Sequence, residues 1–157
     1  MLTPVKKSSI AGNYRIAVVA AEYNATYVNG LLEECQRTLT AAGAQFVVTR
    51  VPGSFEIPAV AAHYATSRKP KFDAVIAFGV IFQGETKHAD HIGLAVSTAL
   101  AQMQAEHKVP VIHGVLLFTN EDQARVRCLG SEHNRGREAA QVALSMARLM
   151  RDLRPLR

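Results

Sequence analysis

An uninterrupted apolar run from Ala74 to Phe82 constrains the fold of this chain more than any other stretch. The run is too short to cross a membrane, and continuous apolar runs of this length are typical of strands buried on both faces in parallel sheets. Polar residues follow directly after Phe82. A helical pattern comes next, with apolar side chains such as Ile92, Val96 and Leu100 at intervals of three and four residues. The stretch therefore predicts a buried strand, a polar turn and a helix.

The polar turn is a candidate anion site, because ligands of open α/β sheets bind at the carboxyl ends of the strands. The backbone N–H groups of Glu85, Thr86 and Lys87 stand at the predicted helix start, where unpaired donors and the helix dipole favour an anion. His88 follows, and a histidine side chain exchanges protons near neutral pH. The same pattern also fits a Thr86 that only caps the helix and a His88 that is a plain surface residue. Local pattern alone leaves both interpretations open.

Strand-like and helix-like segments alternate along the rest of the chain. The predicted strands cover residues 15–20, 44–51, 74–82 and 109–118, and the predicted helices cover 26–42, 55–67, the segment ending near His107, 121–129 and 137–153. This order predicts parallel strands joined by right-handed crossovers. The expected fold class is α/β: a three-layer α/β/α domain with an open four-stranded parallel sheet and helices on both faces. Residues 1–157 are expected to form this single domain, with residues 1–14 as an N-terminal arm.

Composition and charge exclude several classes of protein. Hydrophobic residues make up 48% of the 157 residues and charged residues 20%, which is enough for a substantial core. No apolar run reaches membrane-spanning length and no signal-peptide pattern is present, so no membrane association is expected. The two cysteines, Cys35 and Cys128, are expected to be reduced thiols of a cytoplasmic protein.

The net charge of +5 fits either nucleic acid or a substrate that carries phosphate. No nucleic-acid motif is visible and the few aromatic residues form no stacking stripe, so nucleic-acid binding is not expected. His88 and His91 stand three residues apart, as metal ligands sometimes do. Since no third ligand is signalled nearby, no metal site is expected.

Aromatic and polar residues follow the other strands. Tyr23 comes just after the first strand, where it fits either a lid on the sheet end or an aromatic face for a planar ligand. Ser54 fits a helix cap, and the helix dipole accounts for Glu56. Phe55, so close to a strand end, is less easily explained by capping. His113 interrupts the apolar run of the last strand, where a histidine is usually a core or edge residue and only sometimes a site residue.

Three blocks of sequence carry a resemblance to a known family. They are VPGSFEIP at 51–58, GVIFQGETKH at 79–88, and a tail pattern with Gln123, Ala124, Arg127, Gly130, Asn134, Arg135 and Gly136. Together they resemble the lumazine synthases, the 6,7-dimethyl-8-ribityllumazine synthases of riboflavin biosynthesis. The resemblance runs from about Arg15 to the last helix, and three blocks in the same order and spacing are far more specific than any single glycine motif.

The resemblance implies a flavodoxin-like fold and a transferase activity. The family condenses 5-amino-6-(D-ribitylamino)uracil with 3,4-dihydroxy-2-butanone 4-phosphate and releases phosphate and water, the penultimate step of riboflavin biosynthesis. It needs no metal or organic cofactor. It also implies a homo-oligomer, a pentamer or a multiple of pentamers (a decamer or a 60-mer), with sites between adjacent subunits.

Site roles are carried over from the family residue by residue. The resemblance implies that His88 is the catalytic proton-transfer residue. The pyrimidine and ribityl chain are bound by Tyr23, Ser54, Phe55, Glu56, Val80, Ile81, Phe82 and His113. The phosphate is bound by Gly84, Glu85, Thr86 and Arg127, and Arg135 and Gln83 are further candidates.

Four positions depart from the family pattern. Gln83 stands where the family often has arginine, and Ala89 where it has an aromatic residue. His113 also replaces an aromatic residue, and Arg135 replaces the usual lysine. These departures leave room for a flavin- or lumazine-binding protein with little turnover, or a shell-forming protein, on the same fold. The presence of His88 and Arg127 argues against the binding protein, and the pocket motifs would have no purpose in a shell protein.

Overall fold

The computed structural model describes residues 10–154. The strands are β1 (Arg15–Ala21), β2 (Gln45–Val51), β3 (Ala74–Phe82) and β4 (Val111–Phe118). The α-helices are α1 (Ala25–Ala41), α2 (Ile57–Thr66), α3 (His88–His107), α4 (Glu121–Ala124) and α5 (Arg135–Asp152). A 3₁₀ turn, η1 (Ser54–Glu56), precedes α2, and a π-helical turn, η2 (Arg125–Leu129), follows α4. Most of the predicted N-terminal arm lies outside the described residues.

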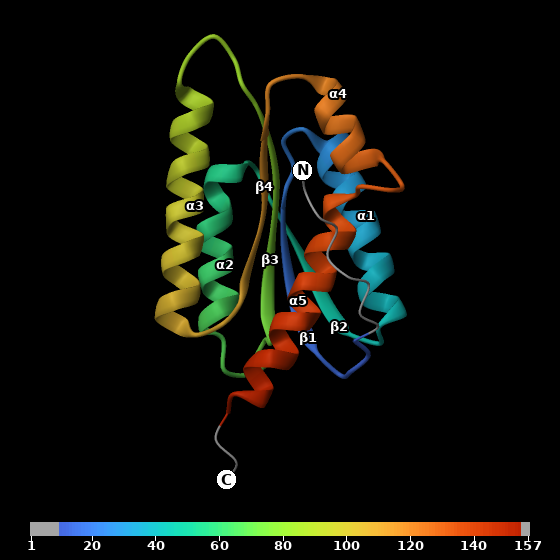
Figure 1. Ribbon diagram of the computed structural model, residues 1–157. Coiled ribbons are helices and arrows are strands. Elements are labelled where there is room, and N and C mark those ends of the chain that lie inside the picture. The colour runs from blue at the N-terminus through green and yellow to red at the C-terminus, as the bar shows by residue number, and fades with distance from the viewer. Residues whose placement is uncertain (1–9, 155–157) are drawn as a thin grey trace.

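The four strands form one parallel sheet in the order β2-β1-β3-β4. Helices α1 and α5 cover one face of the sheet, and α2 and α3 cover the other (Figure 1). This arrangement confirms the predicted three-layer α/β/α architecture. None of the helices in residues 10–154 is long and apolar enough to cross a membrane.

Strand β3 lies between β1 and β4, and its side chains alternate between two apolar cores. Ile76 and Phe78 pack toward α1 and α5, whereas Val75 and Ala77 pack toward α2 and α3. All four side chains are fully buried. A strand covered on both faces has no solvent side, and for that reason the sequence from Ala74 to Phe82 shows no polar alternation.

Two predicted helix starts are wrong. The first helix begins at Ala25, one residue before the predicted start at Thr26, and its N-cap residue is Asn24 in the left-handed region (φ 56°). Ser54 makes no capping hydrogen bond either; it opens the η1 turn, and the α-helix that was predicted from Phe55 starts at Ile57. In each case a tight turn at the strand end takes the place of a side-chain cap.

Two other boundaries also differ from the prediction. The last helix begins at Arg135 rather than Arg137, because the side chain of Asn134 accepts hydrogen bonds from the first turn and caps it. The predicted helix over 121–129 is α-helical only as far as Ala124 and then widens into the π turn.

Candidate functional site

A cavity of about 870 Å³ opens at the carboxyl ends of β1 and β3, between η1 and the start of α3. We call it the His88 cavity. Ten residues predicted to belong to the site line it: Tyr23, Ser54, Phe55, Glu56, Val80, Ile81, Phe82, Gly84, Thr86 and His88. Two others, Gln83 and Glu85, belong to the same loop but do not line the cavity. The sequence blocks 51–58 and 79–88 therefore meet in space.

Two exposed aromatic rings stand on the rim of this cavity. Tyr23 is 73% exposed and Phe55 is 61% exposed. Backbone hydrogen bonds hold the two turns together, since the N–H of Tyr23 donates to the Pro52 carbonyl at 3.1 Å and the N–H of Glu22 donates to the Val51 carbonyl at 2.7 Å. An exposed ring does not seal the end of a sheet, so Tyr23 fits an aromatic face for a planar ligand better than a lid.

The floor of the cavity depends on two close contacts. The Asn24 side-chain amide donates to the Val80 carbonyl at 2.7 Å, which ties the start of α1 to β3. A Cβ at Gly79 would lie 2.4 Å from the Ser54 hydroxyl, so only glycine there lets Ser54 approach the sheet so closely. Sequence reasoning missed Asn24 as a site residue. The residue type was the one signal in the sequence, because asparagine adopts the left-handed backbone conformation more readily than most residues.

The loop before α3 is arranged as an open helix start. Lys87 is the N-cap residue of α3 and its side chain makes no capping hydrogen bond, but the Thr86 hydroxyl accepts from the His88 N–H at 3.4 Å, so Thr86 partly caps the helix. The Gln83 side chain donates to the Thr86 carbonyl at 3.2 Å and the Gln83 N–H donates to the Phe118 carbonyl at 2.8 Å. Gln83 therefore shapes the loop from outside the cavity, and the other N–H groups at the start of α3, together with the helix dipole, favour an anion here.

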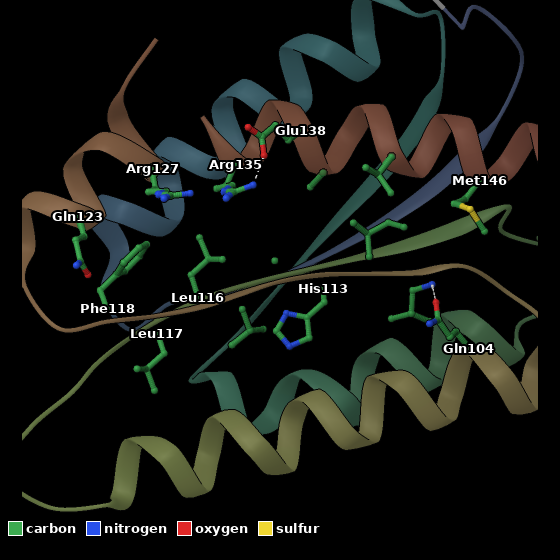
Figure 2. A pocket seen from close by; sticks show the side chains of 16 residues that line it. Gln104, His113, Leu116, Leu117, Phe118, Gln123, Arg127, Arg135, Glu138 and Met146 are labelled. Atoms are coloured by element: carbon green, nitrogen blue, oxygen red, sulfur yellow. Dashed lines mark hydrogen bonds and ion pairs between the residues drawn. The ribbon is translucent and has the colours of Figure 1, made fainter. Parts of the chain in front are cut away.

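A second cavity, of about 960 Å³, lies along the open edge of β4 (Figure 2). We call it the β4-edge cavity. It contains the other predicted residues, with Arg127 and Arg135 on the side of β4 toward α5 and His113 on the side toward α3. No residue lines both cavities. One chain therefore does not bring Arg127 into the cavity that holds Gly84, Thr86 and His88.

The two arginines of the β4-edge cavity differ in their pairing. Arg135 forms an ion pair with Glu138, one turn along α5. Arg127 forms no ion pair within residues 10–154. Its charge is therefore available to an external anion, whereas the charge of Arg135 is largely balanced.

The orientation of His113 is fixed by Ser97 of α3. The Ser97 hydroxyl donates its one proton to the Gly93 carbonyl at 2.6 Å, so the hydroxyl oxygen accepts from Nε2 of His113 at 2.7 Å. A neutral His113 ring then carries its proton on Nε2 and has a free acceptor at Nδ1. Sequence reasoning did not single out Ser97, because nothing local in the sequence pairs a helix serine with a strand histidine.

The two cysteines offer no nucleophile to either cavity. Both are buried, and burial raises the pKa of the Cys35 and Cys128 thiols to about 12. Such thiols stay protonated near neutral pH. Within residues 10–154, no three His, Cys, Asp or Glu side chains lie together in a group that would hold a metal ion.

Comparison with known proteins agrees with the family resemblance that the three blocks carry. The family model described as 6,7-dimethyl-8-ribityllumazine synthase matches residues 13–151. This chain belongs to the lumazine synthase family. A protein of that name from Kineococcus radiotolerans is 40% identical over 145 residues, which are 90% of this chain and 88% of the relative.

Two further relatives with the same name come from distant organisms. The lumazine synthase of Thermococcus kodakarensis is 41% identical over 141 residues, 89% of this chain and 88% of the relative. That of Nitrobacter hamburgensis is 33% identical over 153 residues, 96% of this chain and 94% of the relative. The resemblance seen in the sequence is therefore confirmed over nearly the whole chain.

Proposed function

We propose that this protein is an active 6,7-dimethyl-8-ribityllumazine synthase. It condenses 5-amino-6-(D-ribitylamino)uracil with 3,4-dihydroxy-2-butanone 4-phosphate, the penultimate step of riboflavin biosynthesis, as a transferase without a metal or organic cofactor. One observation carries the proposal: the residues that the family resemblance assigns to the site line two open cavities of the same chain. Docking the β4 edge of one subunit against the His88 cavity of the next completes every site.

The His88 cavity suits the pyrimidine substrate. The exposed rings of Tyr23 and Phe55 offer flat apolar faces to a planar heterocycle. Ser54 and Glu56 on the η1 turn bring polar oxygen atoms to the same cavity, where the hydroxyl groups of a ribityl chain can donate to them. Val80, Ile81 and Phe82 line the apolar side beside the ring.

The loop 83–87 suits the phosphate of the second substrate. Its backbone donors and the start of α3 attract an anion, and Arg127 of the neighbouring subunit supplies the balancing charge. The ketone of the bound butanone phosphate then lies between this loop and the pyrimidine. Holding both substrates in one orientation removes much of the entropic barrier to their reaction.

His88 moves protons in this arrangement. The pyrimidine amine attacks the ketone, and an imine forms with loss of water. Phosphate then leaves, and the ribityl-bearing nitrogen closes the second ring with loss of a second water. Each step transfers protons and none requires an external oxidant. His88 stands in the first turn of α3, directly after the phosphate loop, where its imidazole reaches the atoms between the phosphate-bearing carbon and the attacking amine.

The shared site requires a homo-oligomer. Strand β4 is an edge strand with an apolar sequence, and its Leu117 is 39% exposed. An open apolar edge of this kind is normally covered by another element or another chain. The contact is heterologous, because the β4 edge of one subunit meets the His88 cavity of the next, and such contacts form a ring when the rotation between subunits closes. We infer a pentamer or a multiple of pentamers in the cytoplasm, where the two buried thiols stay reduced.

A mixing assay tests this function. The purified protein is incubated with both substrates, and formation of the lumazine chromophore is followed by absorbance. An active synthase produces the chromophore faster than the uncatalysed mixture, in proportion to the protein concentration. A protein that binds the pyrimidine in titration calorimetry but does not exceed the uncatalysed rate would instead be a lumazine-binding relative without turnover.

A further inference from the structure

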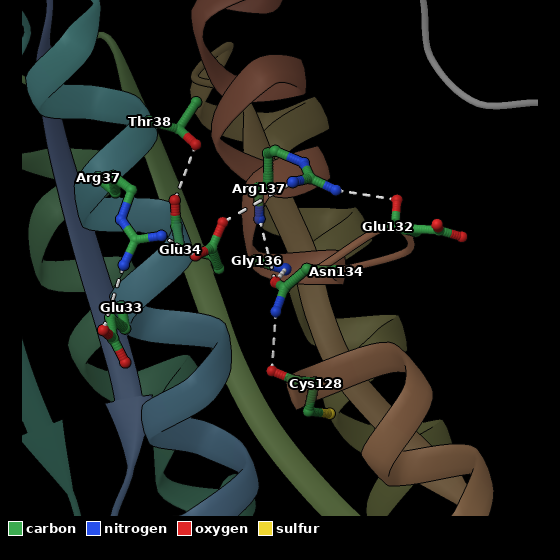
Figure 3. A network of polar contacts seen from close by, with 9 residues as sticks. All are labelled: Glu33, Glu34, Arg37, Thr38, Cys128, Glu132, Asn134, Gly136 and Arg137. Carbon is green, nitrogen blue, oxygen red and sulfur yellow. Dashed lines mark hydrogen bonds and ion pairs between the residues drawn. The ribbon is translucent and has the colours of Figure 1, made fainter. Parts of the chain in front are cut away.

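One buried amide holds the link between η2 and α5. Asn134 is 1% exposed, and within residues 10–154 it is the one polar side chain that is fully buried apart from the cysteines. Its Nδ2 donates to the Cys128 carbonyl at 2.8 Å, and its Oδ1 accepts from the N–H groups of Gly136 at 2.8 Å and Arg137 at 3.4 Å (Figure 3). The amide is thus bonded through both its donor and its acceptor ends.

The groups that Asn134 joins lie next to the two arginines of the β4-edge cavity. Cys128 directly follows Arg127 in the η2 turn, and Asn134 itself directly precedes Arg135 at the start of α5. A π turn departs from the regular α-helical bonding pattern, and carbonyls at a helix end need partners from elsewhere. The Asn134 amide supplies that partner at Cys128 and caps α5 at the same time.

The link has little space in which to shift. A Cβ at Gly30 of α1 would lie 2.5 Å from the Cys128 carbonyl oxygen. A Cβ at Gly136 would overlap the Leu31 carbonyl of the same helix. Both ends of the link that Asn134 holds are therefore packed against the backbone of α1, and only glycine fits at positions 30 and 136.

Ionic contacts fix the outer side of the same link. Arg137 donates to the Glu132 carbonyl at 2.9 Å and lies 3.8 Å from the Glu34 carboxylate of α1 (Figure 3). Glu34 also pairs with Arg37 at 2.6 Å. The link from η2 to α5 thus has bonded contacts with α1, and Asn134 is its buried centre.

We propose that Asn134 is a positioning residue for the phosphate-bearing substrate. It fixes the backbone that carries Arg127 and Arg135. The position of these arginines in turn determines how well they pair with a phosphate bound at the loop 83–87 of the neighbouring subunit. This inference rests on the proposed function. It predicts a selective effect: removing the Asn134 amide weakens capture of the butanone phosphate and leaves capture of the pyrimidine unchanged, because the residues assigned to the pyrimidine line the His88 cavity or, in the case of His113, lie on β4 and not on the link that Asn134 holds.

Asn134→Ser separates the two roles of this side chain. Serine is a good N-cap residue and keeps an acceptor for the first turn of α5, but it is too short to reach the Cys128 carbonyl. Asn134→Asp is a second variant that keeps the cap and loses the donor. The matched control is Asp73→Ala, which also removes a side chain with three hydrogen bonds, to the Arg15 N–H and to Arg151, but at the amino end of β3.

The experiment is steady-state kinetics in which each substrate is varied in turn. For Asn134→Ser we expect the KM for butanone phosphate, and the inhibition constant of inorganic phosphate, to rise about five- to tenfold, the scale of one lost hydrogen bond to a charged or buried group. The KM for the pyrimidine should stay within about twofold, since no contact to it is lost. Asp73→Ala should lower the melting temperature without changing either KM.

A double-variant cycle shows whether Asn134 acts through Arg127. In an Arg127→Ala background, Asn134→Ser should change the affinity for phosphate much less, because the unpaired charge that it positions is gone and Arg135 is paired with Glu138. An unchanged KM for butanone phosphate in Asn134→Ser, or an equal rise in both KM values, would overturn the proposal and leave Asn134 as a helix cap. The affinity of the assembled protein for inorganic phosphate, measured by calorimetry on the same variants, tests the positioning role even if the wild type forms no lumazine.

Discussion

His88 and Arg127 line different cavities of the same chain. His88 lies at the start of α3 beside the carboxyl ends of β1 and β3, whereas Arg127 lies in η2 beside the open edge of β4. Since neither cavity contains a residue of the other, a single chain does not present the proposed proton-transfer group and the proposed phosphate-binding charge to one substrate. The proposed chemistry therefore depends on contact between two copies of the chain.

Assembly should depend on the β4 edge. Leu117→Asp places a charge on the exposed apolar strand, so we expect the oligomer to dissociate and lumazine formation to fall together with it. Light scattering across a range of concentrations measures the mass of the assembly. Leu117→Met is the matched control, because it conserves volume and polarity and should leave assembly and activity intact. A wild-type protein that is active as a 17.1 kDa monomer would contradict the shared site.

Arg127→Ala should weaken binding of the butanone phosphate by about 1.5–3 kcal/mol, the scale for a hydrogen bond to a charged group. Titration calorimetry with that substrate measures the change. Arg125→Ala is the control: Arg125 belongs to the same turn but pairs with Glu121 and does not line the cavity, so its loss should leave the affinity unchanged. Equal affinities of Arg127→Ala and wild type would remove Arg127 from the phosphate site.

His88→Ala should keep the fold and substrate binding and lose about one to two decades of rate, at or below the low end for general acid–base groups. The loss is small because an amine and a ketone react without a catalyst, so positioning supplies most of the acceleration. Steady-state kinetics measure the loss, with circular dichroism to verify the fold. His91→Ala, in the same cavity, is the control and should lose less. If His88→Ala turned over at the wild-type rate between about pH 6 and 8, His88 would have no part in the mechanism and the cavity would only position the substrates.

The sequence predicted the layers of the fold well because burial imposes patterns. The run at Ala74–Phe82 has apolar side chains on both faces, and two cores do flank it. The position of the loop 83–87 and of His88 beside the end of β3 was also predictable, since a strand end followed by a helix start has few alternative geometries. Residues such as Asn24, Ser97 and Asn134 were not assigned their roles, because each bonds to a group whose position is set by tertiary packing. Likewise, the order of the three sequence blocks along the chain does not indicate that Arg127 and His88 lie in separate cavities.

The amino end of the sheet should show a pH-dependent contribution to stability. Burial alone would raise the pKa of Asp73, but hydrogen bonds from Arg151 and from the Arg15 N–H, with the charges of Arg151 and Arg154, bring it below its ordinary value of 3.8. Arg151 also lies 4.3 Å from the centre of the Tyr14 ring. A depressed carboxyl pKa stabilises the folded state at pH values above the ordinary pKa, and this contribution is lost as the pH falls through the depressed value.

Asp73→Asn tests this contribution. The difference in unfolding free energy between wild type and Asp73→Asn should be constant from neutral pH down to about pH 5 and should shrink as the pH falls below the ordinary carboxyl range. Urea unfolding at a series of pH values measures it. A difference that stays the same down to the acid limit would mean that the Asp73–Arg151 pair adds no charge-dependent stability.

The most direct test of the shared site is complementation between two defective subunits. One variant carries Phe55→Ala and His88→Ala, which disable the His88 cavity, and the other carries Arg127→Ala in the β4-edge cavity. When the two are co-expressed in equal amounts, random neighbours place an intact His88 cavity against an intact Arg127 at about one interface in four. We predict that lumazine formation at limiting butanone phosphate recovers to about a quarter of the wild-type rate. A co-assembled protein no more active than the average of its two parents would mean that each site is built within one chain.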